Sequence, residues 1–297
     1  MSLDRIILGT AGLGGVWGPV DPDESVQTIL SALEYGITAI DMAPAYGDAE
    51  LYVGEALRQW KGYKPRISTK VGRGKSFDAS EGYYDYSEEG MFRSLEKSLQ
   101  ILGLEKLDLL FLHDPMHMDE SQAGRAVESL QSFREKGYAT QIGLGGNPPA
   151  FFDQYIRAGV FDVLMEFNKL NACNLSALEE YLPFCNQHQI KYYAASPLYM
   201  GLLGDSFNEF TTNPPAWIDS ETIETAHRIK EIGVAHSISL PALAHRFLLS
   251  LPYKFDIVIG ASNLKQLQQT LEALRKGPLP VSLREILQGT IKEKLFK

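Results

Sequence analysis

The segment Gly36–Gly47, with the sequence GITAIDMAPAYG, joins an apolar run to a loop that carries ionisable side chains. Its first part, Gly36–Ile40, is rich in apolar and β-branched residues and predicts a buried strand. Asp41 follows where that strand ends, and a carboxylate there is costly unless it is paired or takes part in chemistry. A proline and a glycine then mark a loop that carries Tyr46. The segment therefore predicts a strand that delivers an acid and a phenol to one place.

The same unit, an apolar strand followed by an amphipathic helix, recurs along the chain. Short apolar runs predict strands at 5–10, 36–40, 66–70, 107–113, 139–144, 162–167, 190–195 and 256–259. Helices are predicted at 23–35, 50–60, 87–102, 121–136, 149–158, 175–188, 220–232, 239–250, 264–274 and from 282 onward, with Asp23 and Ser282 as N-caps. About eight such units over a length near the ~250 residues typical of this fold predict an α/β protein, a (β/α)8 TIM barrel. No break in composition divides the chain, so we expect a single domain over 1–297.

Polar side chains gather where the predicted strands end. In a barrel of this kind the active site lies at the carboxyl ends of the strands. The residues at these ends are Asp41, Lys70, His113, Asn147, Glu166 and Ser196. We therefore expect Lys70 and His113 to share a site with Asp41 and Tyr46. The polar loop 72–86 is too long for a simple connection, so we expect it to reach over that site.

Four of these side chains suit proton transfer to or from an oxygen atom. The phenol of Tyr46 has an ordinary pKa near ~10 and is able to protonate a forming alkoxide. The ammonium of Lys70 is expected to lower that pKa, and Asp41 to hold the ammonium in place. A neutral His113 would donate a hydrogen bond to the substrate oxygen. Because no side chain supplies a hydride, such a site requires a redox cofactor.

The composition excludes several classes of function. A net charge of −9 argues against nonspecific binding to nucleic acid or to anionic membranes. No apolar run approaches the ~20 residues that span a bilayer. The two cysteines, Cys173 and Cys185, form no disulfide framework, and no signal peptide opens the chain, so we expect a cytoplasmic protein. No coiled-coil pattern is present, and the oligomeric state stays open.

The order and spacing of these residues resemble the aldo-keto reductase superfamily. The Asp-x-Ala-x-x-Tyr-Gly pattern, the later Thr-Lys and the Leu-x-Leu-His that ends at His113 match the superfamily's catalytic tetrad. The resemblance implies a (β/α)8 barrel that binds extended NAD(P)H without a Rossmann motif, with the tetrad roles at Asp41, Tyr46, Lys70 and His113. The Gly-rich stretch 12–18 agrees with this, because Trp17 stands where the G-x-G-x-x-G fingerprint needs a glycine.

The resemblance carries over to the cofactor site less evenly. It implies contacts from Asn147, Glu166, Ser196, Leu198, Gly201, Gly260, Ala261, Ser262, Gln266 and Thr270. Gly146 replaces the usual serine before Asn147, and Glu166 stands near a position where glutamine is common. Gln266 replaces the arginine that grips the 2′-phosphate of NADP, and Thr270 replaces an asparagine near the adenine. Glutamine lacks the charged fork of arginine, so we expect NAD to be preferred over NADP, with Lys265 as the residue able to compensate.

Within the superfamily, Asp85-Tyr86-Ser87 and His113-Asp114-Pro115 resemble a branch of sugar dehydrogenases. The branch includes L-fucose (D-threo-aldose) 1-dehydrogenase, L-galactose dehydrogenase and pyridoxal 4-dehydrogenase. The resemblance implies oxidation of a sugar's anomeric hydroxyl to a lactone, with Tyr46 as the acid/base. The substrate contacts we expect are Trp17, Tyr83, Tyr84 and Asp114.

Three other functions stay open at this point. A general aldehyde or ketone reductase that uses NADPH would need the same tetrad. A non-enzymatic NAD(P)-binding regulatory subunit of a membrane channel would bind the cofactor without turnover. A metal-dependent barrel hydrolase would draw on the segment His113–Asp119, but Pro115 breaks the spacing between its histidines, so we expect no metal site.

Overall fold

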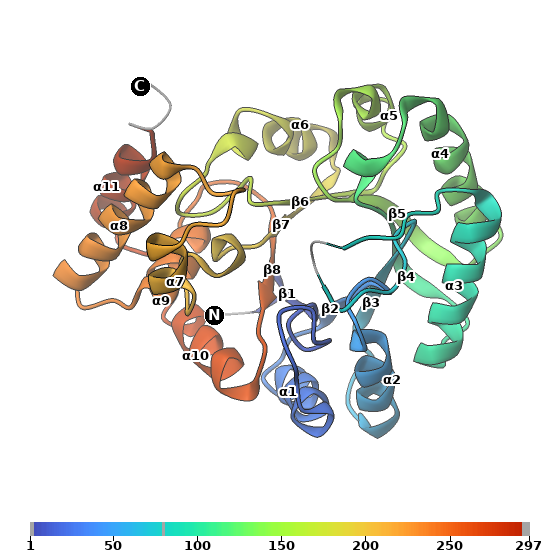
Figure 1. Cartoon of the computed structure of the whole chain (residues 1–297), viewed down its shortest axis with the longest axis horizontal. Helices are drawn as coiled ribbons and strands as arrows, with labels where there is room; N and C mark the ends of the chain where they lie inside the picture. Colours follow the sequence, from blue (N-terminus) through green and yellow to red (C-terminus); the bar gives the residue numbers. More distant parts are fainter. Residues whose placement is uncertain (1–2, 79–80, 293–297) are drawn as a thin grey trace.

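A computed structural model describes residues 3–78 and 81–292 and shows a closed barrel of parallel strands (Figure 1). The strands are paired in chain order, and the first closes the barrel against the last. Their bounds are β1 (Ile6–Gly9), β2 (Ala39–Asp41), β3 (Arg66–Val71), β4 (Leu107–His113), β5 (Ala139–Gly145), β6 (Val163–Phe167), β7 (Lys191–Ala195) and β8 (Asp256–Gly260). The predicted (β/α)8 barrel is confirmed.

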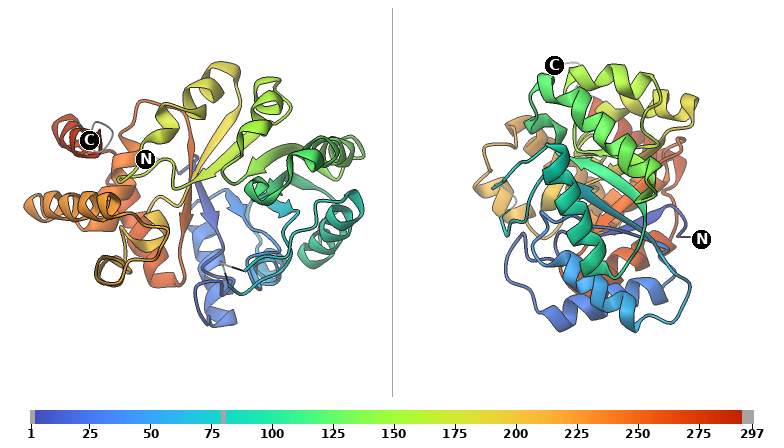
Figure 2. Two further views of the ribbon diagram at one scale, coloured as in Figure 1. Left: turned by 45° about the horizontal axis from the view of Figure 1, so that its top comes forward. Right: turned by 90° about the vertical axis from the view of Figure 1, so that its right-hand side faces the viewer.

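Helices surround the barrel in all three views (Figures 1 and 2). The α-helices are α1 (Pro22–Glu34), α2 (Ala49–Gln59), α3 (Glu88–Leu102), α4 (Glu120–Glu135), α5 (Asp153–Arg157), α6 (Tyr181–His188), α7 (Phe207–Thr212), α8 (Ser220–Ala235), α9 (Leu240–Leu249), α10 (Leu264–Arg275) and α11 (Val281–Lys292). Short 3-10 turns lie at η1 (Pro115–His117), η2 (Ala150–Phe152), η3 (Ser176–Leu178) and η4 (Tyr199–Gly201). The long connection from β7 to β8 contributes α7, α8 and α9, and α11 packs beside α8.

Alternation along the strands separates two apolar clusters. On β4, Leu109 and Phe111 face the lumen, where they join a cluster with Ile7, Ala39, Val163, Met165, Tyr193 and Val258. Leu110 and Leu112 face the helices and belong to the larger cluster between the strands and the outer layer. Successive side chains on a strand point to opposite faces. His113, two residues after Phe111, therefore lies on the lumen side at the carboxyl end of β4.

Several boundaries differ from the sequence predictions for local physical reasons. The N-cap of α1 is Asp21 instead of Asp23, because Asp21 Oδ1 accepts from the backbone N–H of Asp23 at 2.8 Å. The strand predicted at 36–40 begins only at β2, since Gly36 adopts a φ of +97° in a turn. Ser282 is not a cap, because α11 already begins at the residue before it.

The two helices predicted at 149–158 and 175–188 are each divided. The first consists of η2 and the five-residue α5, and the second of η3 and α6. Pro183 has no N–H and is tolerated only in the first turn of a helix, so α6 begins two residues before it. The short helix α7 has no counterpart among the predicted elements.

The loop between β3 and α3 folds back as a short hairpin over the end of β4. Arg73 and Tyr84 form an antiparallel bridge, and the Tyr86 hydroxyl donates to the carbonyl oxygens of His113 and Asp114 at 3.0 and 2.7 Å. The expectation that this loop reaches the barrel mouth is confirmed for its described part, which excludes 79–80.

Within residues 3–78 and 81–292, no single helix is both long and apolar enough to cross a membrane. The pair α8 and α9 passes such a test only when joined, and it is bent by 95°.

Candidate active site

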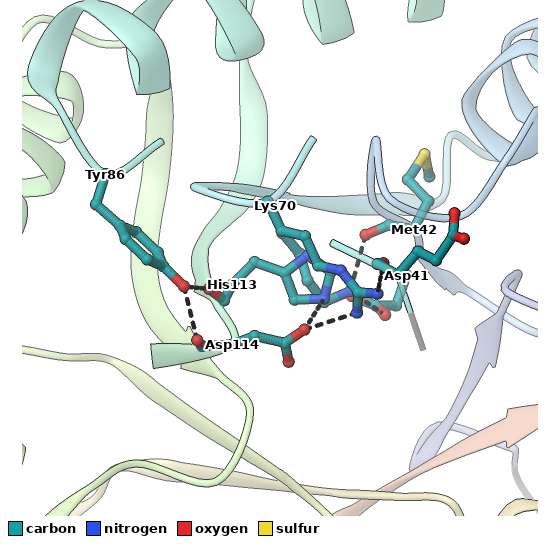
Figure 3. Close-up of polar contacts among 8 residues, drawn as sticks. Asp41, Met42, Lys70, Tyr86, His113 and Asp114 are labelled. Carbon is teal, nitrogen blue, oxygen red and sulfur yellow. Dashed lines mark hydrogen bonds and ion pairs between the residues drawn. The ribbon is translucent and has the colours of Figure 1, made fainter. Parts of the chain in front are cut away.

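Lys70 is the centre of the candidate site and is buried near the carboxyl end of β3 (Figure 3). Its Nζ lies 2.6 Å from Asp41 Oδ2 and 2.8 Å from the carbonyl oxygen of Met42. Ser68 donates its hydroxyl to Asp41 Oδ1 at 2.8 Å, so both carboxylate oxygens have a partner. Burial lowers the pKa of Lys70, and the charges of Asp41 and Tyr46 raise it further than burial lowers it. Lys70 is therefore an ammonium at neutral pH.

Tyr46 lies on the loop after β2, against both Lys70 and His113. The Lys70 Nζ is 4.7 Å from the centroid of the Tyr46 ring, and the His113 ring meets that ring edge-on at a centroid distance of 5.6 Å. Burial raises the pKa of Tyr46, and Lys70 opposes this shift without cancelling it. The predicted lowering of this pKa by Lys70 is present, but burial outweighs it, so the pKa of Tyr46 lies above its ordinary value. Tyr46 is a protonated phenol, which is the form that donates a proton.

Two glycines bring the loop after β1 against the Tyr46 loop. The backbone N–H of Asp48 donates to the carbonyl of Gly14 at 3.0 Å. A Cβ on Gly14 would collide with the Tyr46 carbonyl oxygen, and one on Gly47 would collide with the Gly14 carbonyl oxygen. Gly47 also has a φ of +56°, which favours glycine. The Gly-rich stretch 12–18 thus helps to fix the position of Tyr46.

His113 is buried at the end of β4 and is held uncharged by its surroundings. Burial lowers the pKa of His113 to about 3, although Asp114 acts in the opposite direction. Its Nε2 lies 3.8 Å from Asp114 Oδ2, and its Nδ1 is buried with no hydrogen-bond partner in the part of the chain that the structure describes. A neutral imidazole keeps one N–H donor, so His113 is able to donate to a substrate oxygen.

Asp114 follows His113 in a left-handed backbone conformation, with a φ of +47°. Its Oδ2 accepts a hydrogen bond from Arg73 Nη1 at 2.8 Å, and the two groups form an ion pair. Sequence reasoning missed Arg73. The signal that points to it is a cation three residues after Lys70, inside the loop that was expected to reach over His113.

The absence of the superfamily's serine after β5 has a structural reason. Gly146 has a φ of +141°, and a Cβ there would lie 3.1 Å from the Cα and Oδ1 of Asp114 and from Cδ of Pro115. The left-handed Asp114 therefore crowds out a side chain at this position. Asn147, the next residue, accepts a hydrogen bond through Oδ1 from the Phe167 N–H at 3.1 Å. Its amide NH2 is the end able to donate to a ligand.

Glu166 lies away from the barrel mouth, which corrects the expectation that it contacts the cofactor. Its neighbour Met165 belongs to the lumen cluster, so Glu166 points to the opposite face of β6, toward the helices. Its carboxylate accepts a hydrogen bond from the Tyr192 hydroxyl at 2.8 Å, and burial raises its pKa to about 7. Glu166 is thus satisfied by the outer layer of the protein.

The residues after β7 form a tight turn at the same end of the barrel. Ser196 has a φ of +56°, and its Oγ lies 3.2 Å from Met200 Sδ. Leu198 packs against the larger apolar cluster. Gly201 has a φ of +107°, and a Cβ there would lie 3.0 Å from Ser206 Oγ. The predicted residues Ser196, Leu198 and Gly201 therefore share one compact backbone turn.

One side-chain bridge joins the residues after β8 to the segment that follows the β7 turn. The backbone N–H of Ser262 donates to Gln266 Oε1, and Gln266 Nε2 donates to Asp205 Oδ2, both at 2.8 Å. Asp205 is a second residue that sequence reasoning missed. The remaining expected contacts differ in exposure: Gly260 is exposed at the end of β8, whereas Ala261 and Thr270 are buried.

The four expected substrate contacts fall into two groups. Tyr84 stacks on the His117 ring at a centroid distance of 4.5 Å and on Tyr86 at 6.0 Å, so it lies with Asp114 beside the end of β4. Trp17 and Tyr83 are 54% and 68% exposed on the loops after β1 and β3. The structure places Tyr84 and Asp114 beside the end of β4, and it leaves Trp17 and Tyr83 at the surface.

The histidine-rich segment after β4 provides no support for a metal-dependent hydrolase. Outside 1–2, 79–80 and 293–297, no group of three or more His, Cys, Asp or Glu side chains is arranged to hold a metal ion.

A phenol, an ammonium, a carboxylate and a neutral imidazole meet at the mouth of this (β/α)8 barrel, and together they define an oxidoreductase that moves a proton at a carbonyl or alcohol oxygen. The chemistry of the donors fits a nicotinamide cofactor, because Asn147 offers an amide after β5 and the turns after β7 and β8 offer hydroxyl and backbone groups. The aldo/keto reductase family model matches residues 5–286, and the chain belongs to this family. Aldo-keto reductases use NAD(P)H, so the chain is an NAD(P)-dependent oxidoreductase.

Relatives from the predicted branch are similar along nearly the whole chain. L-galactose dehydrogenase of Arabidopsis thaliana is 28% identical over 289 residues, which cover 92% of this chain and 85% of that protein. D-threo-aldose 1-dehydrogenase of a Pseudomonas species is 28% identical over 303 residues, with 92% and 89% covered. The structure of glycerol dehydrogenase from Gluconobacter oxydans superposes with a TM-score of 0.80 at 23% identity, covers 99% and 93% of the two chains, and supports the fold.

Proposed function

We propose that the protein oxidises the anomeric hydroxyl of an aldose to a lactone, with Tyr46 as the acid/base. The observation that carries this proposal is the buried Lys70, which lies 2.6 Å from Asp41 Oδ2 and 4.7 Å from the centroid of the Tyr46 ring. A buried ammonium beside a phenol favours the phenolate, which is the form that acts as a base. The two sugar dehydrogenases that match over 92% of this chain support an aldose as the substrate.

The chain's own residues divide the work of the reaction. A nicotinamide held at this site would supply the hydride acceptor, a role that no side chain is able to fill. Tyr46 in its phenolate form, which the Lys70 ammonium stabilises, takes the proton from the substrate hydroxyl at its phenolic oxygen and becomes the phenol. Asp41 keeps Lys70 charged and in place, and the neutral His113 donates a hydrogen bond that orients the substrate oxygen. In the reverse direction Tyr46 returns the same proton to a carbonyl oxygen.

We further propose NAD as the preferred cofactor. Gln266, which stands where relatives use arginine for the 2′-phosphate, is already engaged with the Ser262 N–H and the Asp205 carboxylate. A carboxylate at this corner repels a phosphate and accepts hydrogen bonds from free ribose hydroxyls. Lys265, on the first turn of α10, is the exposed cation that acts against this preference.

We propose that Tyr84 and Asp114 contact the sugar near its reacting carbon, and that Trp17 and Tyr83 contact it from the loops above. Aromatic faces and charged oxygens are the groups that sugar sites use for stacking and for hydroxyl recognition.

Residues 1–297 are proposed to form one domain, which the closed barrel supports. A cytoplasmic location is proposed because two cysteines in a chain of this length do not provide a disulfide framework.

The test is to supply the protein with NAD⁺ or NADP⁺ separately and to offer L-fucose, D-arabinose, L-galactose and pyridoxal. Reduced nicotinamide is followed by its near-ultraviolet absorbance, and the product is checked for the lactone. Oxidation of one sugar with NAD⁺, reduced by about 10² to 10⁴ in Tyr46→Phe, is the expected result. Reduction of simple aldehydes with NADPH and no sugar oxidation would establish a general reductase instead. Cofactor binding without turnover on any of these compounds would favour a regulatory subunit.

A further inference from the structure

We propose that Arg73 is a positioning residue for the reaction, because it neutralises the Asp114 carboxylate and thereby keeps His113 uncharged. The inference rests on the proposed function, in which a neutral His113 orients the substrate oxygen. Arg73 forms an ion pair with Asp114, and Asp114 in turn faces His113, so the role of Arg73 is proposed to be exerted through that carboxylate.

One carboxylate oxygen joins the three residues. Asp114 Oδ2 lies 2.8 Å from Arg73 Nη1 and 3.8 Å from His113 Nε2. The Arg73 and Asp114 side chains are only 11% and 12% exposed, and that of His113 is 4% exposed, so water screens these charges weakly. An opposite charge at such a distance favours the protonated imidazole. Asp114 alone would therefore draw a proton onto His113.

Asp114 is fixed in this position and has little freedom to turn away. Its backbone N–H donates to the Gly145 carbonyl at 2.8 Å, and its own carbonyl accepts from the Tyr86 hydroxyl at 2.7 Å. Figure 3 shows the Tyr86 hydroxyl approaching the backbone carbonyl oxygens of His113 and Asp114 on the side away from Lys70. The negative charge of Asp114 therefore has to be compensated by a positively charged partner.

Arg73 is held where it supplies that partner. Its Nη2 donates to the Glu81 carbonyl at 2.6 Å, and its guanidinium lies 5.8 Å from the centroid of the Tyr84 ring. The bridge to Tyr84 anchors its backbone in the hairpin over β4. The guanidinium therefore approaches Asp114 as part of an ordered loop.

The other groups that face His113 do not take over this task. Burial is the largest cause of the low pKa of His113, and Lys70 on β3 lowers that pKa as well, but Lys70 is paired with Asp41 and not with the Asp114 carboxylate. Tyr46 on the loop after β2 and Tyr86 on the loop just before α3 are phenols whose pKa values are raised by burial, so both are neutral. Asp114 is the group that favours protonation of His113, and Arg73 opposes it.

The test is an NMR titration of the full chain with ¹⁵N-labelled histidine, without cofactor or substrate. The chain has six histidines, and the His113 signal is identified by its loss in His113→Gln. In Arg73→Gln the midpoint of His113 is expected to rise by about 1 to 3 pH units, the effect of an uncompensated charge at this distance. Arg73→Lys keeps the charge and is expected to restore a midpoint close to that of the unchanged chain.

Asp114→Asn and the double variant Arg73→Gln/Asp114→Asn complete the comparison, and they remain informative if Arg73→Gln does not fold. With the carboxylate removed, replacing Arg73 is expected to move the His113 midpoint much less than it does when Asp114 is present, because Arg73 then has no neighbouring carboxylate to neutralise. An unchanged His113 midpoint in a folded Arg73→Gln, or a shift of equal size with and without the Asp114 carboxylate, would overturn the proposal. A raised midpoint in Arg73→Gln together with no sugar oxidation by the unchanged chain would refute the proposed function and leave the charge compensation established.

Discussion

Lys70 and Asp41 form an ion pair in which Nζ and Oδ2 are 2.6 Å apart and both side chains are almost completely buried. The pair comes from adjacent strands, since Asp41 pairs in register with Ser68, two residues before Lys70. A charge buried in this way is retained only while its partner stays, because an unpaired ion in the interior is strongly destabilising. The stability of the barrel mouth and the positive charge of Lys70 beside Tyr46 therefore depend on the same ion pair.

Replacing Asp41 by asparagine is expected to damage both stability and turnover. The free energy of unfolding should fall by about 3 to 5 kcal/mol, the usual cost of breaking a buried pair. Turnover should fall as well, because burial then shifts Lys70 toward its neutral form and Tyr46 loses the neighbouring charge. Urea unfolding and steady-state kinetics measure the two effects. Ser68→Ala, which removes one hydrogen bond to Asp41 and keeps both charges, is the matched control and should be milder in both assays.

The two directions of the reaction are expected to depend on pH in opposite ways. Oxidation needs the Tyr46 phenolate, and burial raises the pKa of Tyr46 above its ordinary value, so the oxidation rate should keep rising through the alkaline range. Reduction needs the phenol and should stay level from neutral to mildly alkaline pH. His113 adds no break in the mildly acidic range, because its pKa is about 3. Profiles of kcat/KM against pH test this, and an oxidation profile that levels off at neutral pH would contradict it.

Sequence periodicity was sufficient for the architecture and for the order of the tetrad. Strand β4 was predicted with its observed bounds, because an apolar run that is interrupted only at Asp108 and ends in His113 has few other interpretations. Boundaries at turns were less accurate. Asp21 and Asp23 are equally good cap residues by type, and only the hydrogen bond in the folded chain distinguishes them.

Side-chain direction was the part of the site that sequence could not supply. Glu166 was assigned to the mouth because it lies near a strand end, but a shift of one residue along a strand reverses the face. Arg73 and Asp205 were missed because their partners, Asp114 and Gln266, are distant in sequence. The sign of the Tyr46 pKa shift also depended on burial, which spacing does not reveal.

Cofactor preference is expected to respond to the bridge between Gln266 and Asp205. Gln266→Arg should raise kcat/KM for NADP⁺ relative to NAD⁺, since arginine binds phosphate through two parallel hydrogen bonds. The gain should be larger in Gln266→Arg/Asp205→Asn, because Asp205 would otherwise pair with the new arginine. Steady-state kinetics with both cofactors measure the ratio. Gln268→Arg adds the same charge at an exposed position of α10 and should leave the ratio unchanged; an equal change there would assign the effect to net charge.

His245 is expected to make the barrel sensitive to acid. It is buried in α9, its Nδ1 is 2.9 Å from the Pro241 carbonyl, and burial lowers its pKa from 6.5 to about 4. Between pH 6.5 and about 4, His245 is protonated in the unfolded chain but not in the folded chain, so the free energy of unfolding falls as the pH falls. The loss attributable to His245 between pH 7 and pH 5 should be about 2 kcal/mol. Urea unfolding at the two pH values should show a smaller loss of unfolding free energy for His245→Leu than for the unchanged chain. The control His236→Gln, at an exposed position, should behave like the unchanged chain. Equal losses in all three proteins would show that His245 is already protonated or accessible in the folded state.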